Sequence, residues 1–430
     1  MFTIELERPS GDRFELKYDH RTSELVTPDG DEVVVLGDRK MVFDDAISFS
    51  PSNPLVGKRR KIDTLKIQLG LKCNYSCSYC SQSTHIGEGT LTNIDDAVQF
   101  MTDLDTWMEG SPSSVEIWGG EPLVYWKMIT YLAPELRKRF PEVKLSFFTN
   151  GSLLNNEKVE FIKKYDIGIT MSHDGPGQHI RGDDPFEDET VFHSVKRLVE
   201  EHSDFTVNAV ISHQTADVNK TVDWFKEHVH PDIKVAFEGV VDSHGDNGFG
   251  TAGSFDADSY QVMIDSIKRN IHDVDLDDAG FLAYTRDFIN SIFHSVQATA
   301  NGQKCGMDRQ DTMAVDLKGN VMTCHNTGAE GEHGLGSVFD LDNVALDTSW
   351  HWSERPDCGG CPYLQICKGA CMFLSGNNWV DTCENNYHYS KAIFEAVIER
   401  LVGATVVGFR GHHTRPKKRE HTKIDLVDLS

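Results

Sequence analysis

Three cysteines stand close together in the stretch LKCNYSCSYCSQ, residues 71–82. Cys73, Cys77 and Cys80 have the spacing C-x3-C-x2-C. Three thiolates can each bind one iron of a four-iron four-sulfur cluster and leave the fourth iron open to another ligand. A zinc ion with a distant fourth ligand, such as His85, is the alternative that this spacing allows. The loop therefore predicts a metal centre, and the first interpretation includes a vacant coordination position.

Seven more cysteines lie in the last third of the chain. They follow the spacing C-x18-C, a gap, C-x2-C-x5-C-x3-C, a second gap and a final cysteine: Cys305, Cys324, Cys358, Cys361, Cys367, Cys371 and Cys383. A structural zinc ribbon uses four cysteines and would explain only about half of these seven. The spacing predicts further metal chemistry in this region.

Composition places the chain among globular proteins. It has 430 residues, of which 39% are hydrophobic, and its formal net charge is -25. No apolar run reaches the roughly 20 residues that span a bilayer, and the first residues lack the order of a secretory signal, so we expect a cytoplasmic protein without a membrane partner. Thiols stay reduced in that compartment, which favours metal binding over disulfides. The acidic surface argues against nucleic acid as a partner and allows a basic peptide, although solubility alone explains such a charge.

The pattern of apolar residues predicts an α/β fold. Residues 1–63 contain short alternating strands (FTIELE, RFELKYD, EVVVLG) and form a small β-rich domain. From residue 64 to 300, six apolar runs alternate with helix-length segments, which predicts a parallel sheet that is either doubly wound or closed into a full or partial barrel. The first helix shows the period at Ile94, Ala97, Val98, Met101, Leu104 and Met108, behind Thr92 or Asn93 as the cap. In either fold the site lies where the strands end.

The remaining segments are less regular. Residues 242–258 are rich in glycine and aspartate and are predicted to be a surface loop, followed by two helical segments. Residues 301–395 form a cysteine-rich second domain. Residues 396–430 contain a helix end and the basic stretch RGHHTRPKKREHTK, which is predicted to be a disordered tail.

The three-cysteine loop resembles the signature of the radical S-adenosylmethionine (SAM) superfamily, in which an aromatic residue, here Tyr79, precedes the last cysteine. WGGEPLV resembles the GGEP motif of the family, and MSHDGP resembles its SLDGP motif. The resemblance implies a partial (β/α)6 barrel and assigns SAM contacts to the backbone around Gly119, Gly120 and Glu121 and to Ser172, Arg181 and Asn208. Asn150 is expected to shape a turn at a strand end instead.

The resemblance also implies the chemistry. The open iron chelates SAM, and one electron from a donor such as flavodoxin or ferredoxin cleaves it to a 5'-deoxyadenosyl radical, which abstracts hydrogen from the substrate. The cofactors perform the difficult chemistry, while the protein orients the reactants and excludes water.

The seven later cysteines resemble a SPASM domain, which in radical SAM peptide maturases carries two auxiliary iron-sulfur clusters. This resemblance implies three four-iron clusters in all, one that binds SAM and two auxiliary. It assigns Cys358, Cys361, Cys367 and Cys383 to one auxiliary cluster, and Cys305, Cys324 and Cys371 to the other. The fourth position of the second cluster is open, filled by Asp308 or Asp311, or taken by substrate.

Three functions remain open. The first is a radical SAM enzyme that modifies a peptide or protein side chain, for example by a thioether or carbon-carbon crosslink, with or without a separate leader-recognition protein. The second is a maturase similar to anaerobic sulfatase-maturating enzymes, which form formylglycine. Those relatives place an aspartate general base where this chain has His325, so histidine would have to take the proton. The third is a non-catalytic iron-sulfur or zinc protein that serves as an electron carrier or scaffold.

Overall fold

The computed structural model describes residues 1–33, 57–244, 255–273 and 283–417. Within these ranges the β-strands are β1 (Phe2–Glu7), β2 (Arg13–Asp19), β3 (Glu24–Val26), β4 (Thr64–Gln68), β5 (Ser114–Trp118), β6 (Lys144–Thr149), β7 (Ile167–Ser172), β8 (Phe205–Ile211), β9 (Val235–Val240), β10 (Thr312–Asp316), β11 (Asn320–Met322), β12 (Gly334–Ser337) and β13 (Thr405–Arg410). The α-helices are α1 (Ile94–Trp107), α2 (Trp126–Arg139), α3 (Asn156–Lys164), α4 (Glu189–Glu201), α5 (Val218–His228), α6 (Ala257–Asp273), α7 (Ala283–Phe293), α8 (Leu364–Cys367) and α9 (Gly376–Val402). Most of the strand expected at residues 32–37 and of the loop at 242–258 lies outside the described residues.

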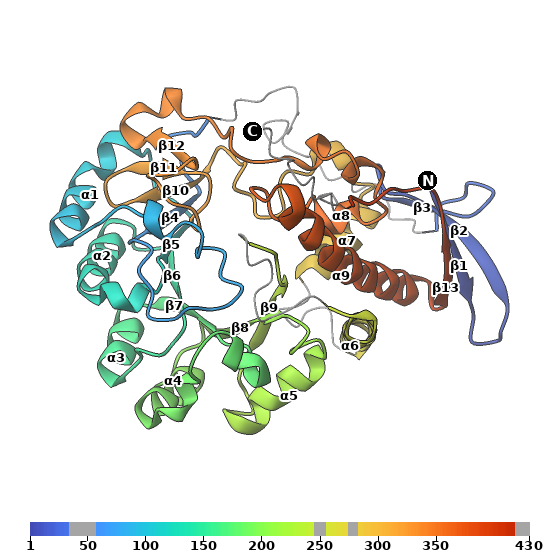
Figure 1. The fold of residues 1–430 in the computed structure, drawn as a ribbon, viewed down its shortest axis with the longest axis horizontal. Helices are drawn as coiled ribbons and strands as arrows, with labels where there is room; N and C mark the ends of the chain where they lie inside the picture. The colour runs from blue at the N-terminus through green and yellow to red at the C-terminus, as the bar shows by residue number, and fades with distance from the viewer. Residues whose placement is uncertain (34–56, 245–254, 274–282, 418–430) are drawn as a thin grey trace, which may run out of the picture.

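Six parallel strands, β4 to β9, form the central sheet in their order along the chain. Each is followed by one helix, α1 to α6, and these helices stand on the outer side of the curved sheet (Figure 1). A doubly wound sheet would reverse its strand order at a switch point and place helices on both faces. The fold is therefore the partial (β/α)6 barrel that the family resemblance implied.

The first helix shows how local sequence sets these elements. Asn93 caps α1 by accepting hydrogen bonds from the backbone N–H groups of Asp95 and Asp96, and the Asp96 carboxylate accepts one from Asn93 N in return. This reciprocal arrangement satisfies donors that the first turn leaves free. The buried face consists of Ala97, Phe100, Met101, Leu104 and Trp107. Val98 was placed on this face from the sequence, which is wrong, because its side chain is exposed and Phe100 takes that role.

Strand alternation separates an apolar outer face from a more polar inner face. In β7 and β8 every second residue is buried, including Ile169, Met171, Val207 and Ala209, whereas Thr170, Ser172, Thr206 and Asn208 are only half-buried. Successive side chains of a strand point to opposite faces of the sheet. The buried set packs toward the helices, and the half-buried set faces the inside of the barrel.

The cysteine-rich region is joined to the barrel through its sheet. Strand β10 pairs in parallel with β4, from Thr312 opposite Thr64 to Asp316 opposite Gln68, and β11 and β12 extend the sheet in antiparallel pairs. This sheet therefore crosses the boundary expected near residue 300. It also brings the segment between Cys305 and Cys324 next to the strand that precedes the three-cysteine loop.

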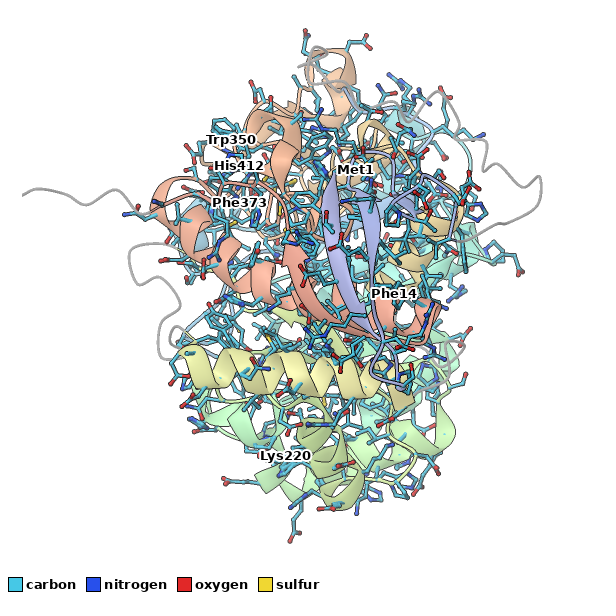
Figure 2. The ribbon with its side chains drawn as sticks, turned by 90° about the vertical axis from the view of Figure 1, so that its right-hand side faces the viewer. Met1, Phe14, Lys220, Trp350, Phe373 and His412 are labelled. Atoms are coloured by element: carbon cyan, nitrogen blue, oxygen red, sulfur yellow. The ribbon has the colours of Figure 1, made fainter. Side chains whose placement is uncertain are left out.

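The two ends of the chain share a second sheet, with the order β13-β1-β2-β3. Figure 2 looks onto this sheet, with Met1 and Phe14 on it and the long helix α9 behind. Phe2, Ile4 and Tyr18 pack with Phe394 of α9 in one buried cluster. The basic stretch at the carboxyl end was expected to be a disordered tail, and for residues 410–417 this is wrong. Arg410 ends β13, and the residues up to 417 lie on the cysteine-rich region.

No helix among the described residues is long and apolar enough to cross a membrane.

Candidate functional site

The three-cysteine loop follows β4 and is held at the mouth of the barrel by the segment that follows β5. Gly120 N donates to Gly70 O at 2.9 Å, and Glu121 N donates to Lys72 O at 3.0 Å. A Cβ on Gly120 would stand 2.4 Å from the carbonyl oxygen of Leu71. Glycine is therefore required here so that this segment can approach the cysteine loop, a reason that differs from the ligand approach expected from the motif.

The side chain of Glu121 is buried, and its hydrogen bonds are made within the protein. It is 0% exposed, and its carboxylate accepts hydrogen bonds from Thr149 Oγ1 at 2.6 Å, Asn150 N at 2.7 Å and Leu123 N at 2.9 Å. Burial raises its pKa, while these three donors oppose the rise. The carboxylate ties the end of β5 to the end of β6, so any contact of Glu121 with a cofactor would have to come from its backbone.

Asn150 braces the cysteine loop from β6. Its Oδ1 accepts from Ser152 N at 3.0 Å, which closes the turn after β6, and its Nδ2 donates to Asn74 Oδ1 at 2.9 Å. Asn74 directly follows Cys73. Asn150 therefore shapes the strand-end turn, as expected, and also positions the first cysteine.

A third brace comes from the segment that follows β7, where the 3-10 helix Gly175–Ile180 ends next to Arg181. Arg181 Nη1 donates to the hydroxyl of Tyr79 at 2.6 Å, and that hydroxyl donates to the carboxylate of Asp174. Ser78 N donates to Ile180 O at 3.0 Å. Tyr79 and Arg181 were both expected at the cofactor site, and the structure brings them together through Asp174, which sequence reasoning missed.

Arg181 is buried, and its Nε has no hydrogen-bond partner among the described residues. The charges of Tyr79 and Asp174 raise its pKa, against the effect of burial, so it is a fixed cation. An unsatisfied donor on a buried cation is costly unless an anionic or polar ligand supplies the missing bond. The carboxylate or ribose of SAM has the acceptor atoms that this position needs.

Ser172 and Asn208 are direct neighbours on β7 and β8 in the parallel register. Both are half-buried on the inner face of the sheet. No hydrogen bond of either side chain to another described residue is present, so their polar groups are free to bind a ligand inside the barrel.

The three thiols of the loop lie near one another. Each is partly buried, and the pKa of Cys77 is raised to about 11, first by burial and then, against the opposing charge of Arg181, by Cys80 and Cys73. Thiols with raised pKa values ionise only when a strong cation binds them. Within the described ranges no three His, Cys, Asp or Glu side chains are close enough to hold one metal ion. His85 instead contacts Glu88 Oε2 through Nδ1 at 2.9 Å. A four-iron cluster binds each of its thiolate ligands through a different iron.

Four later cysteines surround one cavity. Its walls include Cys358, Cys361 and Cys367 from the segment that contains α8, and Cys383 from α9. Thr414, Arg415 and Pro416 of the carboxyl-terminal segment form another wall. The four cysteines that were assigned to one auxiliary cluster therefore do come together in space.

Cys305, Cys324 and Cys371 form the second group. Burial raises the pKa of Cys371 most, and the negative charges of Asp242, Cys305 and Cys324 raise it further. Cys305 Sγ lies 3.6 Å from Met372 Sδ. Cys305 is exposed, while Cys324 is buried. Residue Cys305 as a whole is thus exposed, while its sulfur lies against Met372.

Two aspartates were candidates for the missing ligand of this group, and the structure separates them. Asp311 is engaged by Arg309 through two contacts of 2.9 Å. Asp308 is 4% exposed, accepts from Gln303 N through Oδ2 at 2.8 Å, and has no partner for Oδ1. Its charge raises the pKa of Cys305, after the larger effect of burial. Asp308 has the free oxygen that a metal ligand needs, and Asp311 does not.

The loop between Cys367 and Cys371 explains how two cysteines four residues apart reach different groups. Lys368, Gly369 and Ala370 all have positive φ angles, 49°, 84° and 59°. In a continuing α-helix, residues four apart would share one face. The left-handed run reverses the chain, which is unfavourable for Lys368 and Ala370 and is typical of functional sites.

His325 lies between the barrel mouth and Cys324. Its ring centroid is 3.8 Å from that of Trp118, which in turn stacks on Phe148 at 3.9 Å. Its Nδ1 is 3.7 Å from Cys324 Sγ, and Gln68 Nε2 donates to its carbonyl oxygen at 2.7 Å. Burial lowers the pKa of His325 well below its usual value, so the ring is neutral at neutral pH. Trp118 directly precedes the Gly119-Gly120-Glu121 segment, which places His325 beside the expected SAM site.

Comparison with known proteins agrees with this geometry. The family model of the radical SAM superfamily matches residues 67–225, which include the end of β4, the cysteine loop and β5 to β8. Residues 67–225 thus match a radical SAM domain. Domains of this kind bind SAM and an iron-sulfur cluster, and the braced three-thiol loop with Arg181 above it provides suitable groups for both.

Curated relatives extend beyond the radical SAM domain. Radical SAM cyclopropyl synthase TigE of Paramaledivibacter caminithermalis is 21% identical over 335 residues, which cover 73% of this chain and 68% of that enzyme. A cysteine-type anaerobic sulfatase-maturating enzyme of Clostridium perfringens is 22% identical over 359 residues, which cover 77% of this chain and 94% of the enzyme.

Solved structures show the same fold. Histidine-tagged anSMEcpe with bound AdoMet aligns with a TM-score of 0.58 and 20% identity, over 79% of this chain and 94% of that one. Native anSMEcpe with bound AdoMet and Kp18Cys peptide aligns with a TM-score of 0.56 and 18% identity, over 79% and 98%. The shared fold thus extends beyond residues 67–225.

Three residues around the cysteines were missed from sequence. Asp174 holds Tyr79 and Arg181 together, Arg355 lies between the two later cysteine groups, and Arg415 forms part of the cavity wall. Asp174 belongs to the SHDGP motif, which was a usable signal. The two arginines belong to no motif that we recognised.

Proposed function

We propose that the chain is a radical SAM enzyme that modifies a peptide or protein side chain and carries two auxiliary iron-sulfur clusters. The observation that carries the proposal is the division of ten cysteines into three groups, one in the loop after β4 and two in the cysteine-rich region. Cys73, Cys77 and Cys80 would hold the SAM-binding cluster. Cys358, Cys361, Cys367 and Cys383 would hold one auxiliary cluster, and Cys305, Cys324 and Cys371, with Asp308 as the fourth ligand, the other.

When bound, the first cluster and SAM supply a 5'-deoxyadenosyl radical that takes a hydrogen atom from the substrate. Arg181 would donate Nε to an acceptor of SAM, with Tyr79 and Asp174 keeping the guanidinium in place. Ser172 and Asn208 would add polar contacts from the inner face of the sheet, and the backbone of Gly119, Gly120 and Glu121 would accept from the SAM amino group.

The auxiliary groups suit an overall oxidation of the substrate. Forming a crosslink removes two hydrogen atoms from the substrate. One leaves with 5'-deoxyadenosine, and the second leaves as a proton and an electron. The cysteine group nearest the barrel, which contains Cys324, is where an electron acceptor would sit. His325 next to it would receive the proton, since its Nε2 has no bond to a described residue.

The substrate class is supported by the relatives, one a cyclopropyl synthase and the other a sulfatase maturase whose structure is known with bound peptides. A sulfatase-type maturase is the second candidate. It is favoured because the alignment covers 94% of the sulfatase-maturating enzyme of Clostridium perfringens. A flavodoxin or ferredoxin would supply the electron for SAM cleavage, and a separate protein would recognise a leader peptide.

The proposal is tested by anaerobic reconstitution under reducing conditions that keep the thiols free. The wild-type protein with SAM and a reductant is expected to release 5'-deoxyadenosine and methionine, and Cys73→Ala is expected to release neither. A non-catalytic scaffold would cleave no SAM in either form. Co-expression with a small peptide encoded next to the gene, followed by mass spectrometry, tests the substrate. A loss of about two hydrogens indicates a crosslink, whereas formylglycine formation on a sulfatase peptide favours the second candidate.

A further inference from the structure

Arg355 lies at the junction of the two later cysteine groups. Its Nη2 donates to the carbonyl oxygens of Cys371 and Leu374, both at 2.9 Å. Its backbone carbonyl accepts from Cys358 N at 3.0 Å. Arg355 therefore contacts a cysteine of the three-thiol group with its side chain and a cysteine of the four-thiol group with its backbone.

The rest of the guanidinium is buried without partners. The side chain is 4% exposed, and its Cζ lies 4.7 Å from the centroid of the Trp379 ring. Nε and Nη1 make no hydrogen bond, and no described carboxylate forms an ion pair with it. A buried cation with two free donors is strongly unfavourable unless an anion is nearby. The position thus lacks a negatively charged, hydrogen-bond-accepting partner.

The cysteines that interact electrostatically with Arg355 indicate where that partner would be. Burial lowers the pKa of its guanidinium, and the charges of Cys358, Cys371, Cys367 and Cys383 act in the opposite direction. These four thiols belong to both groups. An iron-sulfur cluster bound by thiolates is an anion whose sulfur atoms accept hydrogen bonds, and such bonds help to set its reduction potential.

We propose that Arg355 is a positioning residue shared by the two auxiliary clusters, to which it donates its free N–H groups and whose reduction potentials it raises together. The inference rests on the proposed presence of both clusters. Reduction adds an electron to an anion, so a fixed positive charge at close range in a low-dielectric interior favours the reduced state. Because this guanidinium contacts the Cys371 backbone and interacts electrostatically with cysteines of both groups, its removal affects both potentials.

Arg415, in the wall of the four-cysteine cavity, provides a matched comparison. It pairs with Glu384 at 2.8 Å, stacks over Tyr387 and is 39% exposed. Its charge acts on Cys361 and Cys383, and no effect on Cys371 is present. Its neutralised and solvent-screened charge should have a small effect, limited to one cluster.

The test is a redox titration of the reconstituted full chain, followed by electron paramagnetic resonance. A background with Cys73, Cys77 and Cys80 replaced by alanine isolates the auxiliary signals. Arg355→Gln retains a donor for the loop carbonyls and removes the charge, so we expect full iron content and a shift of both auxiliary midpoint potentials to more negative values. Arg415→Gln is expected to shift at most the cluster of Cys358. In the unaltered background, the SAM-binding cluster should keep its potential in both variants.

Unchanged potentials in Arg355→Gln with full iron content would overturn the proposal, as would a shift of one auxiliary cluster alone. If Arg355→Gln loses iron, Arg355→Lys decides. If Arg355→Lys keeps its full iron content and both auxiliary potentials stay close to those of the wild type, the result supports an effect of the positive charge. If Arg355→Lys also loses iron, Arg355 only caps the loop carbonyls. A wild-type protein with about four irons or fewer would instead refute the auxiliary clusters themselves, which separates the two failures.

Discussion

The hydroxyl of Tyr79 accepts a 2.6 Å hydrogen bond from Nη1 of Arg181, a residue 102 positions later in the chain. The same hydroxyl donates to Asp174, whose Oδ1 accepts from Val210 N at 3.0 Å. Tyr79 of the cysteine loop therefore orients Arg181, the arginine that we assign to SAM binding. Asp174, which follows β7 and is held by Val210 of β8, fixes Tyr79 in turn.

Tyr79→Phe should weaken SAM binding by about tenfold, because the guanidinium loses a hydrogen bond of the charged type, which is worth roughly 1.5–3 kcal/mol. Equilibrium binding of SAM to the reconstituted protein measures this. Tyr75→Phe is the control, since Tyr75 donates to the backbone of Asp183 from the same loop and does not touch Arg181. Equal losses in the two variants would show that only loop packing matters.

Iron content should divide among the three cysteine groups. We expect about twelve irons in the wild type, about eight in Cys73→Ala, and a similar value in Cys305→Ala or Cys383→Ala. The losses should add in double variants that combine two groups, because the thiols of each group face a different centre. Colorimetric iron analysis after anaerobic reconstitution checks this, and a complete loss from any single variant would contradict separate sites.

Asp308→Ala should change the cluster at Cys305, Cys324 and Cys371, while Asp311→Ala should not. Asp308 has a buried oxygen without a partner, and Asp311 is already held by Arg309. Loss of a fourth ligand makes the iron it binds labile, so mild oxidation should convert this cluster to a three-iron form visible by electron paramagnetic resonance. The same signal in wild type and Asp308→Ala would mean that the position is open or is occupied by another group.

The carboxyl-terminal segment should protect the four-cysteine site. A chain that ends after Arg410 keeps β13 but lacks Thr414, Arg415 and Pro416 from the cavity wall. We expect several-fold faster iron release to a chelator from this form than from a chain that ends after Lys417. Identical rates in the two truncated forms would show that residues 411–417 do not shield the site.

Two buried histidines, His244 and His333, predict a loss of stability in acid. His85, His244 and His333 contact Phe373 through their rings. Burial, followed by the charge of His85, lowers the pKa of His244 to about 4 and lowers that of His333. A depressed pKa means that the unfolded chain binds the proton more tightly, so this stability is complete above pH 6.5 and is lost as the pH falls toward 4.

For His244 the loss is at most about 3 kcal/mol. His244→Phe keeps a ring against Phe373 and cannot be protonated, so its melting temperature should fall less between pH 7 and pH 5 than that of the wild type. Parallel curves for the two proteins would exclude His244 as a source of the pH dependence.

The sequence by itself determined the local elements and the chemical types. The strands follow from the alternation of side chains along the chain. The capped helix at 94–107 follows from hydrogen bonds between residues three apart, which form without any distant segment. The spacing at Cys73, Cys77 and Cys80 likewise pointed to one three-thiol loop, which the structure places directly after β4. The error at Val98 arose because a helix has two adjacent apolar edges, and only the facing sheet decides which is buried.

Only the tertiary structure decided which distant groups meet. Nothing in residues 2–7 or 405–410 specifies that β1 pairs with β13, and the basic composition of the last residues concealed their packing on the four-cysteine cavity. The division of Cys367 and Cys371 between two groups depends on a left-handed run at Lys368, Gly369 and Ala370, and the free donors of Arg355 depend on the burial around them. Contacts between segments separated by tens or hundreds of residues form because the whole core excludes the alternatives, and residue type and spacing alone do not contain that information.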